Sequence, residues 1–447
     1  MEYLPNILFL LLLIAGVGLF TRNIRRVIRN VKLGKSVENL GDKSERWKQM
    51  LLVAIGQSKM VTKPISGFLH VIVYVGFIII NVELLEIIAD GIFGTHRLFS
   101  SFLGGFYQVL IATFELLAFL VVLSVVLFWI RRNILKINRF LKPEMKSWPK
   151  NDANYILYFE VVLMGLFLTM NAADFKLQQL GVEPYAFAGG IVGSFSISTY
   201  IAGFFDTLSA STLIIIERTA WWLHIIGILT FLNYLYWSKH LHIMLAFPNV
   251  WFASVAPKGK FDNMASVTKE VKLMMDPNAD PFAAPPAAEG DEVPATFGAS
   301  DIFDLNQIQL LNAYTCTECG RCTQQCPANI TGKKLSPRKI MMDTRDRLEE
   351  VGKIINTRGQ FEDDGKKLLD DYISREELWA CTTCNACVEA CPVGINPLSI
   401  IMDMRRYLIM EQSAAPNELN VAMTNIENNA APWPYNQMDR LNWANEN

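Results

Sequence analysis

The chain has 447 residues, of which 51% are hydrophobic and 19% are charged, and its formal net charge is −2. Soluble proteins carry about 25% charged residues, and the mean hydropathy here is positive, at +0.23. These values exclude a disordered chain and a basic protein that binds nucleic acid, and they are typical of a membrane part joined to a soluble part. Eight cysteines are too few for a disulfide-stapled mini-protein.

Five long apolar stretches predict membrane-spanning helices, because each is close to the ~20 residues that cross a bilayer core. They cover Tyr3–Phe20, Ser66–Ile88, Phe106–Ile130, Tyr155–Asn171 and Ala220–Trp237. The first stretch lacks a preceding basic residue and a small-residue cleavage site, so we interpret it as a retained helix rather than a signal peptide. The uncharged stretch from Pro184 to Phe205 is long enough to span, but it is rich in Gly, Ser and Thr, and we expect a re-entrant or interfacial segment.

Basic residues gather in two connections, from Arg22 to Lys63 and from Arg131 to Lys150. The connections that alternate with them contain Arg97, Lys176 and Arg218 as their basic residues. The positive-inside rule therefore predicts an external N-terminus and a cytoplasmic location for everything after the fifth helix. The sequence predicts a multi-pass protein of a bacterial inner membrane.

All eight cysteines lie in two runs, Cys316–Pro327 and Cys381–Pro392. Each run has the pattern C-x2-C-x2-C-x3-C-P of ferredoxins with two [4Fe-4S] clusters, in which the fourth cysteine of a run ligates the other cluster. We therefore assign two ligand sets: Cys316, Cys319, Cys322 and Cys391 for the first cluster, and Cys381, Cys384, Cys387 and Cys326 for the second. The alternatives are zinc, which favours two separated C-x2-C arms, and disulfides, which are rare in a cytoplasmic domain.

The two cysteine runs belong to an internal repeat, since each is followed by a helix predicted to begin with proline, at Pro337 and at Pro397. The step from the first run to the second is too long for a compact bacterial ferredoxin, so a mainly α-helical domain is predicted. The charged residues shared by the two repeat helices are expected to form surface pairs rather than to take a redox role; they are Asp343, Arg345, Asp403 and Arg405.

Histidines in membrane helices are candidate haem ligands, because an isolated histidine is costly to place in a bilayer. His224 and His242 are separated by five helical turns, so we expect them on one face of one helix. His70 should lie at the depth of His242, and we predict that this pair holds a b-type haem. His224 is a candidate for a second haem, for which His96 would have to fold back as the partner. An interfacial cluster without metal is the alternative for His240 and His242.

Four carboxylates lie in or at the edges of the predicted membrane helices: Glu83, Glu86, Glu115 and Glu160. Buried carboxylates there mark proton paths or pair with a cation, and a quinone site that exchanges protons would use such groups. Carboxylates near helix ends are equally compatible with contact with water. The sequence therefore assigns no quinone site.

The first 245 residues resemble the cytochrome b-type gamma subunit of respiratory nitrate reductase, which has five helices and histidines on the second and fifth. The resemblance implies two b haems, each held by one histidine from each of these helices; it supports His70 with His242 and leaves His224 without a partner. The segments Leu310–Cys322 and Leu378–Cys384 are similar to the iron–sulfur proteins known as the C subunits of heterodisulfide reductase and of anaerobic glycerol-3-phosphate dehydrogenase.

Together the two resemblances indicate a membrane-bound, heterodisulfide-reductase-like iron–sulfur oxidoreductase. Such proteins imply a cytoplasmic partner with a CCG domain or a flavin, and no cysteine remains in this chain for a CCG domain. The predicted fold class is all-α: a five-helix transmembrane cytochrome b-like bundle followed by an α-helical 2[4Fe-4S] ferredoxin domain. The expected parts are a membrane domain, a linker, a dicluster domain and an extended C-terminal tail, at residues 1–245, 246–300, 301–412 and 413–447.

The functional prediction is an oxidoreductase subunit that passes electrons between a (mena)quinone pool and a cytoplasmic partner, through b-type haem and two [4Fe-4S] clusters. The competing hypothesis is a membrane-tethered ferredoxin without quinone chemistry of its own. The aromatic tail is expected either to dock on the partner or to be disordered. No Gly-rich dinucleotide motif follows a predicted strand, so we expect no bound NAD or FAD, and no feature indicates nucleic-acid binding.

Overall fold

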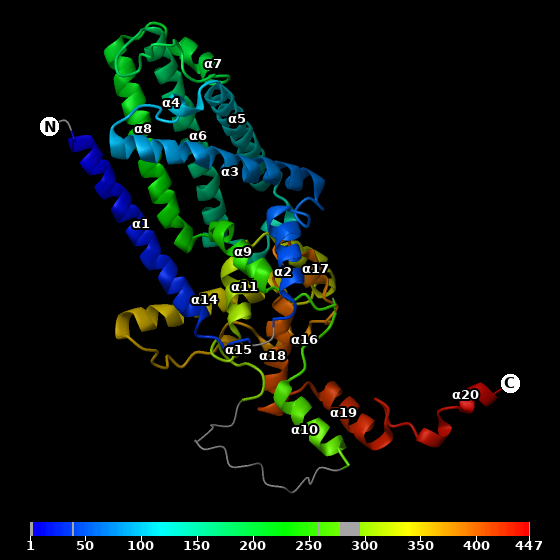
Figure 1. The fold of residues 1–447 in the computed structure, drawn as a ribbon. Helices are drawn as coiled ribbons and strands as arrows, with labels where there is room; N and C mark the ends of the chain where they lie inside the picture. The colour runs from blue at the N-terminus through cyan, green and yellow to red at the C-terminus, as the bar shows by residue number, and fades with distance from the viewer. Residues whose placement is uncertain (1–2, 38–39, 258, 278–295, 447) are drawn as a thin grey trace.

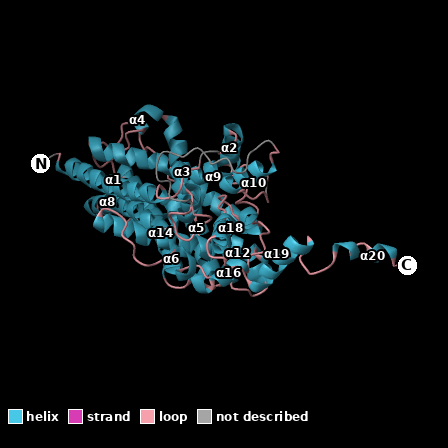
Figure 2. Cartoon of the chain, turned by 90° about the horizontal axis from the view of Figure 1, so that it is seen from below, coloured by secondary structure: helices cyan, strands magenta, loops and turns pink. Residues whose placement is uncertain are grey.

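The computed structural model describes residues 3–37, 40–257, 259–277 and 296–446, and these ranges form helices with isolated β-bridges in place of a sheet (Figures 1 and 2). The predicted all-α fold class is confirmed. The Pro- and Ala-rich part of the expected linker, residues 278–295, lies outside the described ranges. The described remainder of that segment carries most of helix α9 (His242–Phe252) and all of α10 (Ala265–Met275).

Five helices are long and apolar enough to cross a membrane. Each has 25 to 32 residues, more than predicted, because the helices continue beyond their apolar windows. They are α1 (Leu4–Val31), α3 (Pro64–Phe93), α5 (Gly105–Asn133), α6 (Trp148–Gln179) and α8 (Ala210–Tyr234). The stretch from Pro184 to Phe205 forms loops and the short helix α7 (Ser198–Ala202), and it adds no sixth span within the described residues.

The bundle has two distinct ends, shown in Figure 1. The proximal end, next to the cysteine-containing part, carries α2 (Lys43–Gln49), a π-helical segment (Met50–Ile55) and α9. The distal end carries α4 (Ser100–Leu103), α7 and the loop between α6 and α8. In this view α3 crosses α8 at a steep angle, while α6 packs against both α5 and α8.

The cysteine-containing part consists of eight short or medium helices. They are α11 (Gln307–Thr315), α12 (Arg321–Gln325), α13 (Pro327–Ile330), α14 (Pro337–Arg358), α15 (Leu368–Asp371), α16 (Arg375–Trp379), α17 (Ala386–Ala390) and α18 (Pro397–Met410). The predicted helix starts at Pro337 and Pro397 are confirmed. The side chains of Ser336 and Asn396 cap these helices by accepting backbone N–H groups three residues further on.

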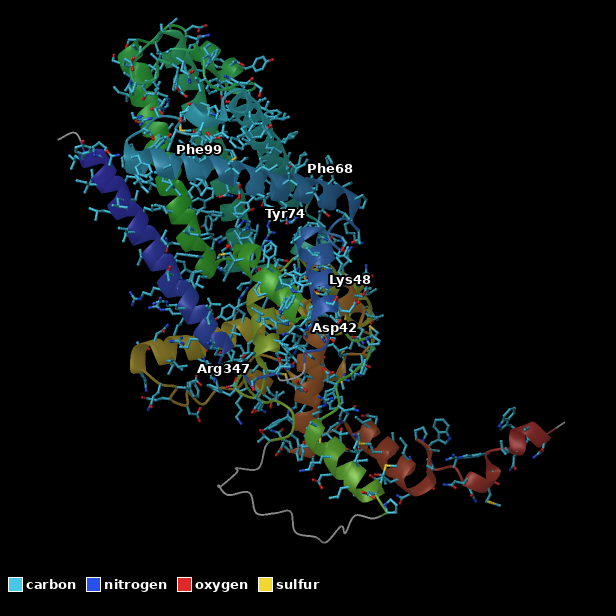
Figure 3. The ribbon with its side chains drawn as sticks, viewed as in Figure 1. Asp42, Lys48, Phe68, Tyr74, Phe99 and Arg347 are labelled. Atoms are coloured by element: carbon cyan, nitrogen blue, oxygen red, sulfur yellow. The ribbon has the colours of Figure 1, made fainter. Side chains whose placement is uncertain are left out.

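One buried arginine orders the segment between the two cysteine runs. The guanidinium of Arg347, labelled in Figure 3, is fully buried and donates to Asp301 at 2.8 Å and to Asp364 at 2.6 Å. It also donates to the backbone oxygen of Lys366. Because a buried guanidinium needs carboxylate and carbonyl acceptors, these contacts tie α14 to the chain before α11 and to the loop before α15.

The two halves of the chain share one hydrophobic core. Val27 of α1 and Phe231 of α8 belong to the same buried cluster as Ile302 and Leu310 of the dicluster part. Polar contacts cross the same boundary: the amide of Asn30 donates to the Tyr314 hydroxyl at 2.7 Å. The dicluster part is therefore packed on the proximal end of the bundle rather than merely tethered to it.

The C-terminal tail is not extended throughout, contrary to expectation. Helix α19 covers Asn417–Asn429 and α20 covers Asn442–Asn445. Pro416 directly precedes α19, and the following thirteen residues contain no helix-breaking Gly or Pro, so a short helix forms there. Figure 1 shows the tail leaving the body of the molecule, and Trp433 and Trp443 are exposed.

Candidate redox site

The first predicted ligand set lines one small cavity of about 20 Å³. The cavity is bordered by Cys316, Cys319, Cys322 and Cys391, and also by Cys387 of the second run. The structure therefore brings the fourth cysteine of the second run to the first three of the first run, as the crossed assignment requires.

The second predicted ligand set gathers around α17. The thiols of Cys381 and Cys387 lie close enough to Cys326 and Cys384 for their negative charges to repel one another. All eight cysteines are free thiols, and Cys384 is exposed. Within the described ranges, no group of three or more His, Cys, Asp or Glu side chains is arranged to hold a single metal ion. Ligation of iron by these two sets stays a prediction.

The sulfur atoms sit in an environment that disfavours free thiolates. Burial, together with neighbouring cysteine charges, raises the pKa of Cys316 and of Cys387 to about 12, and that of Cys391 to about 11. Backbone N–H groups partly offset this: Thr383 donates to the Cys381 sulfur at 3.4 Å. A thiolate becomes stable in such a site when a bound metal supplies positive charge, so the arrangement fits iron–sulfur ligation.

The backbone of the two cysteine loops follows the same course. Glu318 and Gly320 have left-handed backbone conformations in the first loop, and Thr383 and Asn385 have them at the matching positions of the second. Gly320 has a second constraint, because a Cβ atom there would lie 2.5 Å from Nη1 of Arg338. The repeat seen in the sequence is thus a repeat of loop geometry.

The expected surface pairs form at Asp343, with Lys339, and at Asp403, with Arg406. For the arginines of the repeat helices the expectation is wrong, because they contact the cysteine loops. Arg345 donates to Glu318, in the loop between the first two cysteines, at 2.8 Å. Arg405 donates to the backbone oxygens of Leu378 and Cys381, both at 2.6 Å. Each repeat helix therefore places a guanidinium against one cysteine run, where its charge favours a negatively charged cluster.

The first cysteine loop is bonded directly to the bundle. Arg321 donates to the backbone oxygens of Lys59 and Met60, at 2.9 and 3.0 Å, just before α3 begins. Glu318, whose side chain is 2% exposed, forms an ion pair with Lys239, which precedes the histidine pair. Burial would raise the pKa of Glu318, but Lys239 and Arg345 outweigh it and hold the pKa below its usual range.

A second polar contact joins the loop between α5 and α6 to α14. The Oε1 atom of Glu144 accepts hydrogen bonds from Ser336 and from the fully buried Arg338, both at 2.7 Å. Burial alone would raise the pKa of Glu144, but these two donors outweigh it and lower the pKa. Arg338 also donates to the backbone oxygen of Arg139 at 2.8 Å.

Three of the five histidines meet at the proximal end of the bundle. The rings of His240 and His242 have centroids 5.4 Å apart, and His70 of α3 lies within electrostatic reach of both. His242 donates from Nδ1 to the backbone oxygen of Lys239 at 3.1 Å, which leaves its Nε2 lone pair free, and Nδ1 of His70 is buried without a partner. Burial lowers the pKa of His242, and it lowers that of His240 to about 3, so both are neutral imidazoles.

His224 lies elsewhere, and the predicted single helix for His224 and His242 is wrong. Helix α8 ends at Tyr234, and His242 begins α9 after two short 3-10 turns. Ser238 interrupts the helix because its extended backbone lets its side chain cap the next turn. His224 lines a cavity between α3, α5, α6 and α8, and its Nδ1 donates to the backbone oxygen of Leu163 at 3.0 Å.

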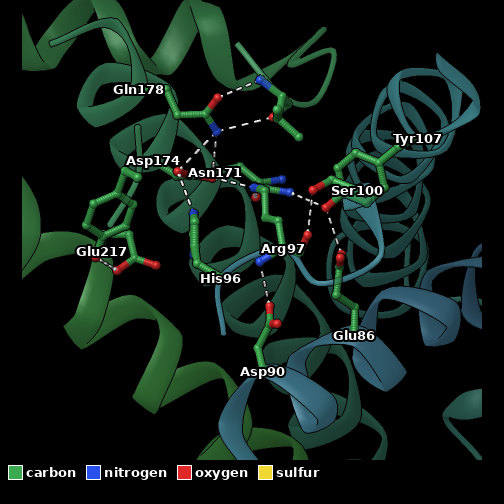
Figure 4. Close-up of polar contacts among 12 residues, drawn as sticks. Glu86, Asp90, His96, Arg97, Ser100, Tyr107, Asn171, Asp174, Gln178 and Glu217 are labelled. Atoms are coloured by element: carbon green, nitrogen blue, oxygen red, sulfur yellow. Dashed lines mark hydrogen bonds and ion pairs between the residues drawn. The ribbon is translucent and has the colours of Figure 1, made fainter. Parts of the chain in front are cut away.

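A buried polar network at the distal end was not predicted as a unit (Figure 4). Arg97 donates to Asp174 at 2.5 Å, to Asn171 at 2.8 Å and to the Tyr107 hydroxyl at 3.0 Å. His96 donates to the other oxygen of Asp174 at 3.1 Å. It therefore does not fold back toward His224, as a second haem held by these two histidines would require. The signal available in the sequence was the presence of isolated charges, Asp174 among them, in an apolar setting.

The family model described as a 4Fe-4S dicluster domain matches residues 315–395. The probable iron-sulfur-binding oxidoreductase FadF of Bacillus subtilis is 29% identical over 98% of this chain and 61% of its own length. The EtfAB:quinone oxidoreductase of Syntrophomonas wolfei is 27% identical over 93% of this chain and 56% of its own length. The C subunit of a CoB-CoM heterodisulfide reductase of Methanosarcina acetivorans is 30% identical over 29% of this chain and 66% of its own length.

The chain thus spans about three fifths of the length of the two relatives that match along most of it. No solved structure matches the chain significantly. Its homologues are iron–sulfur oxidoreductases and the C and D subunits of heterodisulfide reductases, and the expected resemblance to heterodisulfide-reductase-like proteins is confirmed. The dicluster domain supports two [4Fe-4S] clusters, and the five apolar helices indicate a multi-pass membrane protein.

Proposed function

We propose that this homologue of iron–sulfur oxidoreductases is a membrane-bound subunit that passes electrons between a (mena)quinone pool and a cytoplasmic redox partner. One observation carries the proposal: the first cysteine loop is bonded to the proximal end of the bundle beside the histidine cluster of His70, His240 and His242. A redox-active loop and a set of membrane imidazoles are thereby neighbours, as electron transfer between a soluble site and a membrane site requires.

In this proposal, Cys316, Cys319, Cys322 and Cys391 would hold one [4Fe-4S] cluster and the second set would hold the other. Such clusters supply one-electron chemistry, while the protein sets their spacing and surroundings. The exposure of Cys384 supports a second cluster that would face the partner, and the contact of Arg321 with the segment before α3 supports a first cluster that would face the membrane.

The residues fit one b-type haem at the proximal end. His70 and His242 come from α3 and from the start of α9, and each has a ring nitrogen without a protein partner. A second haem at His224 does not fit, because the residues of α3 that line its cavity include Asn81 and Glu83 but no histidine. We therefore propose a single haem, which would supply one further one-electron carrier.

The proposed quinone and redox partner are inferred from the names of the relatives, and the proposed orientation in the membrane is inferred from the charge pattern. The name of one relative specifies EtfAB and quinone as its reaction partners, and a cytoplasmic partner with a flavin or a CCG domain suits the exposed second cysteine set. The basic residues after α1 and α5 favour a cytoplasmic dicluster domain at residues 301–412 and an external distal end, in a bacterial inner membrane.

The test is a set of optical and chemical measurements on the full chain purified in detergent. We expect about eight non-haem iron atoms per chain, and a Cys381→Ser variant that loses about half of them. We also expect b-type absorbance that a naphthoquinol reduces, that His70→Ala and His242→Ala abolish, and that His224→Ala leaves in place. Iron content that does not change in Cys381→Ser would overturn the cluster assignment.

The second candidate is a membrane-tethered ferredoxin that does not react with quinone. It is favoured by a relative from Chromohalobacter salexigens named a probable membrane-anchored ferredoxin, 31% identical over 35% of this chain and 26% of its own length. Clusters that assemble normally but are never reduced by naphthoquinol, in protein without b-type absorbance, would establish this alternative.

A further inference from the structure

A cavity in the middle of the bundle belongs neither to the cysteine sets nor to the proximal histidines. It has a volume of about 110 Å³ and lies between α3, α5, α6 and α8. Its walls are mainly apolar, and its polar lining consists of Asn81, Glu83, Glu160 and His224. An apolar protein cavity of about 150 Å³ holds a benzene molecule, so this cavity matches part of an aromatic ring system.

One wall of the cavity, formed by α3, reaches the outer apolar surface of the bundle. Phe77, which lines it, is 46% exposed on the surface of the bundle, and the neighbouring Val82 and Leu85 on the same helix are also exposed. A molecule dissolved in the bilayer would therefore meet the wall of the cavity at Phe77 without passing through water.

Two polar side chains that line the cavity, Glu83 and His224, each have an atom without a protein partner. Glu83 is 4% exposed, and its Oε2 atom has no hydrogen-bond partner. His224 donates from Nδ1 to the backbone oxygen of Leu163, so its Nε2 lone pair remains available. An unpartnered carboxyl oxygen in an apolar interior costs free energy, and a ligand that offers a hydroxyl or carbonyl oxygen would remove that cost.

Glu83 interacts with the distal polar network through charge rather than through a hydrogen bond. Glu86, one helical turn further along α3, accepts from the Tyr107 hydroxyl at 2.8 Å. The charged groups around Glu83 are Arg97, Glu86, Glu115 and Asp174, all buried in the same region.

From Tyr107 the contacts continue through Arg97 and Asp174 to His96 (Figure 4). Arg97 bridges Tyr107 and Asp174, and Asp174 accepts from His96, whose side chain is 15% exposed. Polar groups thus follow one another from the cavity to the distal surface, and because Arg97 stays protonated, the carboxyl, phenol and imidazole groups are the proton carriers of the series. The described contacts include no comparable series from the cavity to the proximal end.

We propose that this cavity binds the ring of a quinone and that its protons are exchanged with the distal side of the membrane. This inference rests on the proposed quinone-linked function. In the oxidising direction, a quinol QH2 becomes Q and releases two electrons and two protons. The electrons pass singly to one-electron carriers at the proximal end, and the protons pass through Glu83 and the network that ends at His96. Reduction of Q takes up two electrons and two protons by the same routes.

The location is tested by photolabelling of the full chain with an azido-naphthoquinone, followed by peptide mass spectrometry. We expect labelled peptides from the helices that line the cavity, α3, α5, α6 and α8. A variant that fills the cavity, Ile80→Trp, should lose the label at least about tenfold, whereas the lipid-facing Leu85→Trp on the same helix should keep it. Label confined to other helices, or equal labelling of the two variants, would overturn the site.

The sidedness is tested in lipid vesicles that carry the holoprotein with its dicluster domain outward, as verified by protease accessibility. Naphthoquinol in the lipid is oxidised by external hexaammineruthenium(III), a one-electron oxidant that does not cross the bilayer, and a trapped dye reports the lumenal pH. The reaction is QH2 + 2 Ru(III) → Q + 2 Ru(II) + 2 H⁺. We expect the protons to appear in the lumen, next to the distal end.

Two variants test the route. His96→Gln keeps a hydrogen-bond donor for Asp174 but does not titrate, and Glu83→Gln removes the carboxyl at the cavity; both should slow lumenal acidification by about 10²-fold. The control is Lys176→Gln, which breaks an ion pair with Asp206 at the same end of the bundle, outside the network. Unchanged spectra of the iron–sulfur centres will show that each variant is folded.

The outcomes separate this inference from the proposed function. If naphthoquinol reduces the wild-type protein but the protons appear outside, or His96→Gln acidifies the lumen at the wild-type rate, the distal route is wrong and the quinone-linked function stands. If naphthoquinol never reduces the wild-type protein, the proposed function fails together with the inference.

Discussion

The contact between Glu144 and Arg338 allows a quantitative test of how the dicluster part is held on the bundle. Arg338 is fully buried, and Glu144 is its carboxylate partner from the loop between α5 and α6. Removal of one member of a buried ion pair costs roughly 3–5 kcal/mol, because the remaining charge is left without compensation. In Glu144→Ala, Arg338 would keep the backbone oxygen of Arg139 at 2.8 Å and a longer contact to that of Glu318 at 3.5 Å.

Glu144→Gln separates charge from hydrogen bonding, since the amide oxygen still accepts from Ser336 and Arg338. Replacement of a charge-assisted hydrogen bond by a neutral one costs about 1–2 kcal/mol. Where a protease cleaves a transiently opened form, the cleavage rate follows the population of that form. At 1.4 kcal/mol per decade, proteolysis at this boundary should accelerate about 10²- to 10³-fold in Glu144→Ala and about tenfold in Glu144→Gln.

The pH dependence has a definite sign. The pKa of Glu144 is lower in the folded protein than the ~4.3 of an unperturbed glutamate, so its contribution is complete above pH ~4.3 and is lost as the pH falls through the lower folded value. The difference in protease resistance between wild type and Glu144→Gln should therefore be constant near neutral pH and shrink below pH ~4.

The control is Glu362→Ala, which breaks an exposed pair with Arg358 and should change the rate by less than about threefold. Cleavage of Glu144→Ala within threefold of wild type would show that the buried pair does not hold the dicluster part in place.

Three further predictions concern the redox site. His242→Ala should abolish the b-type absorbance, whereas His240→Ala should retain it, because the proposed haem uses His70 and His242; optical spectra of reduced protein decide this. Cys384→Ser should lose about half of the bound iron and leave the other cluster detectable by electron paramagnetic resonance. Gly320→Ala should destabilise the first cysteine loop by about 1–3 kcal/mol in denaturant unfolding, because φ is +72° and the new methyl group meets Arg338; unchanged stability would contradict the close approach.

Local patterns predicted the parts of the fold that depend on local physics. The five apolar stretches form helices because a single run of about twenty apolar residues can satisfy all its backbone hydrogen bonds inside a bilayer only as a helix. The repeat helices begin at Pro337 and Pro397 because proline and a preceding Ser or Asn cap favour a helix start irrespective of tertiary contacts. The cysteine spacing likewise led to the two groups of thiols that the structure brings together.

Features that depend on distant contacts were missed. Helical periodicity placed His224 and His242 on one helix, but the chain breaks at Ser238, and nothing in the periodicity of the flanking residues signals this break. The pairing of Arg97 with Asp174 joins the loop after α3 to helix α6, two segments far apart in the sequence, so no local pattern contains it. Arg345 and Arg405 were predicted to lie in surface pairs. Their acceptors are mostly backbone or loop atoms, and no charge pattern in the sequence reveals such acceptors.

The core shared between the bundle and the dicluster part has a consequence for the proposed exchange of electrons with a soluble partner. A ferredoxin on a flexible tether can swing between its donor and its acceptor, but this one is fixed by Asn30, Glu144 and Lys239 of the membrane half. Its orientation toward the bilayer is therefore constant. In the proposed electron transfer, a soluble partner would have to diffuse to the edge at the exposed Cys384, and collisions there, rather than motions inside the chain, would limit the rate of electron exchange.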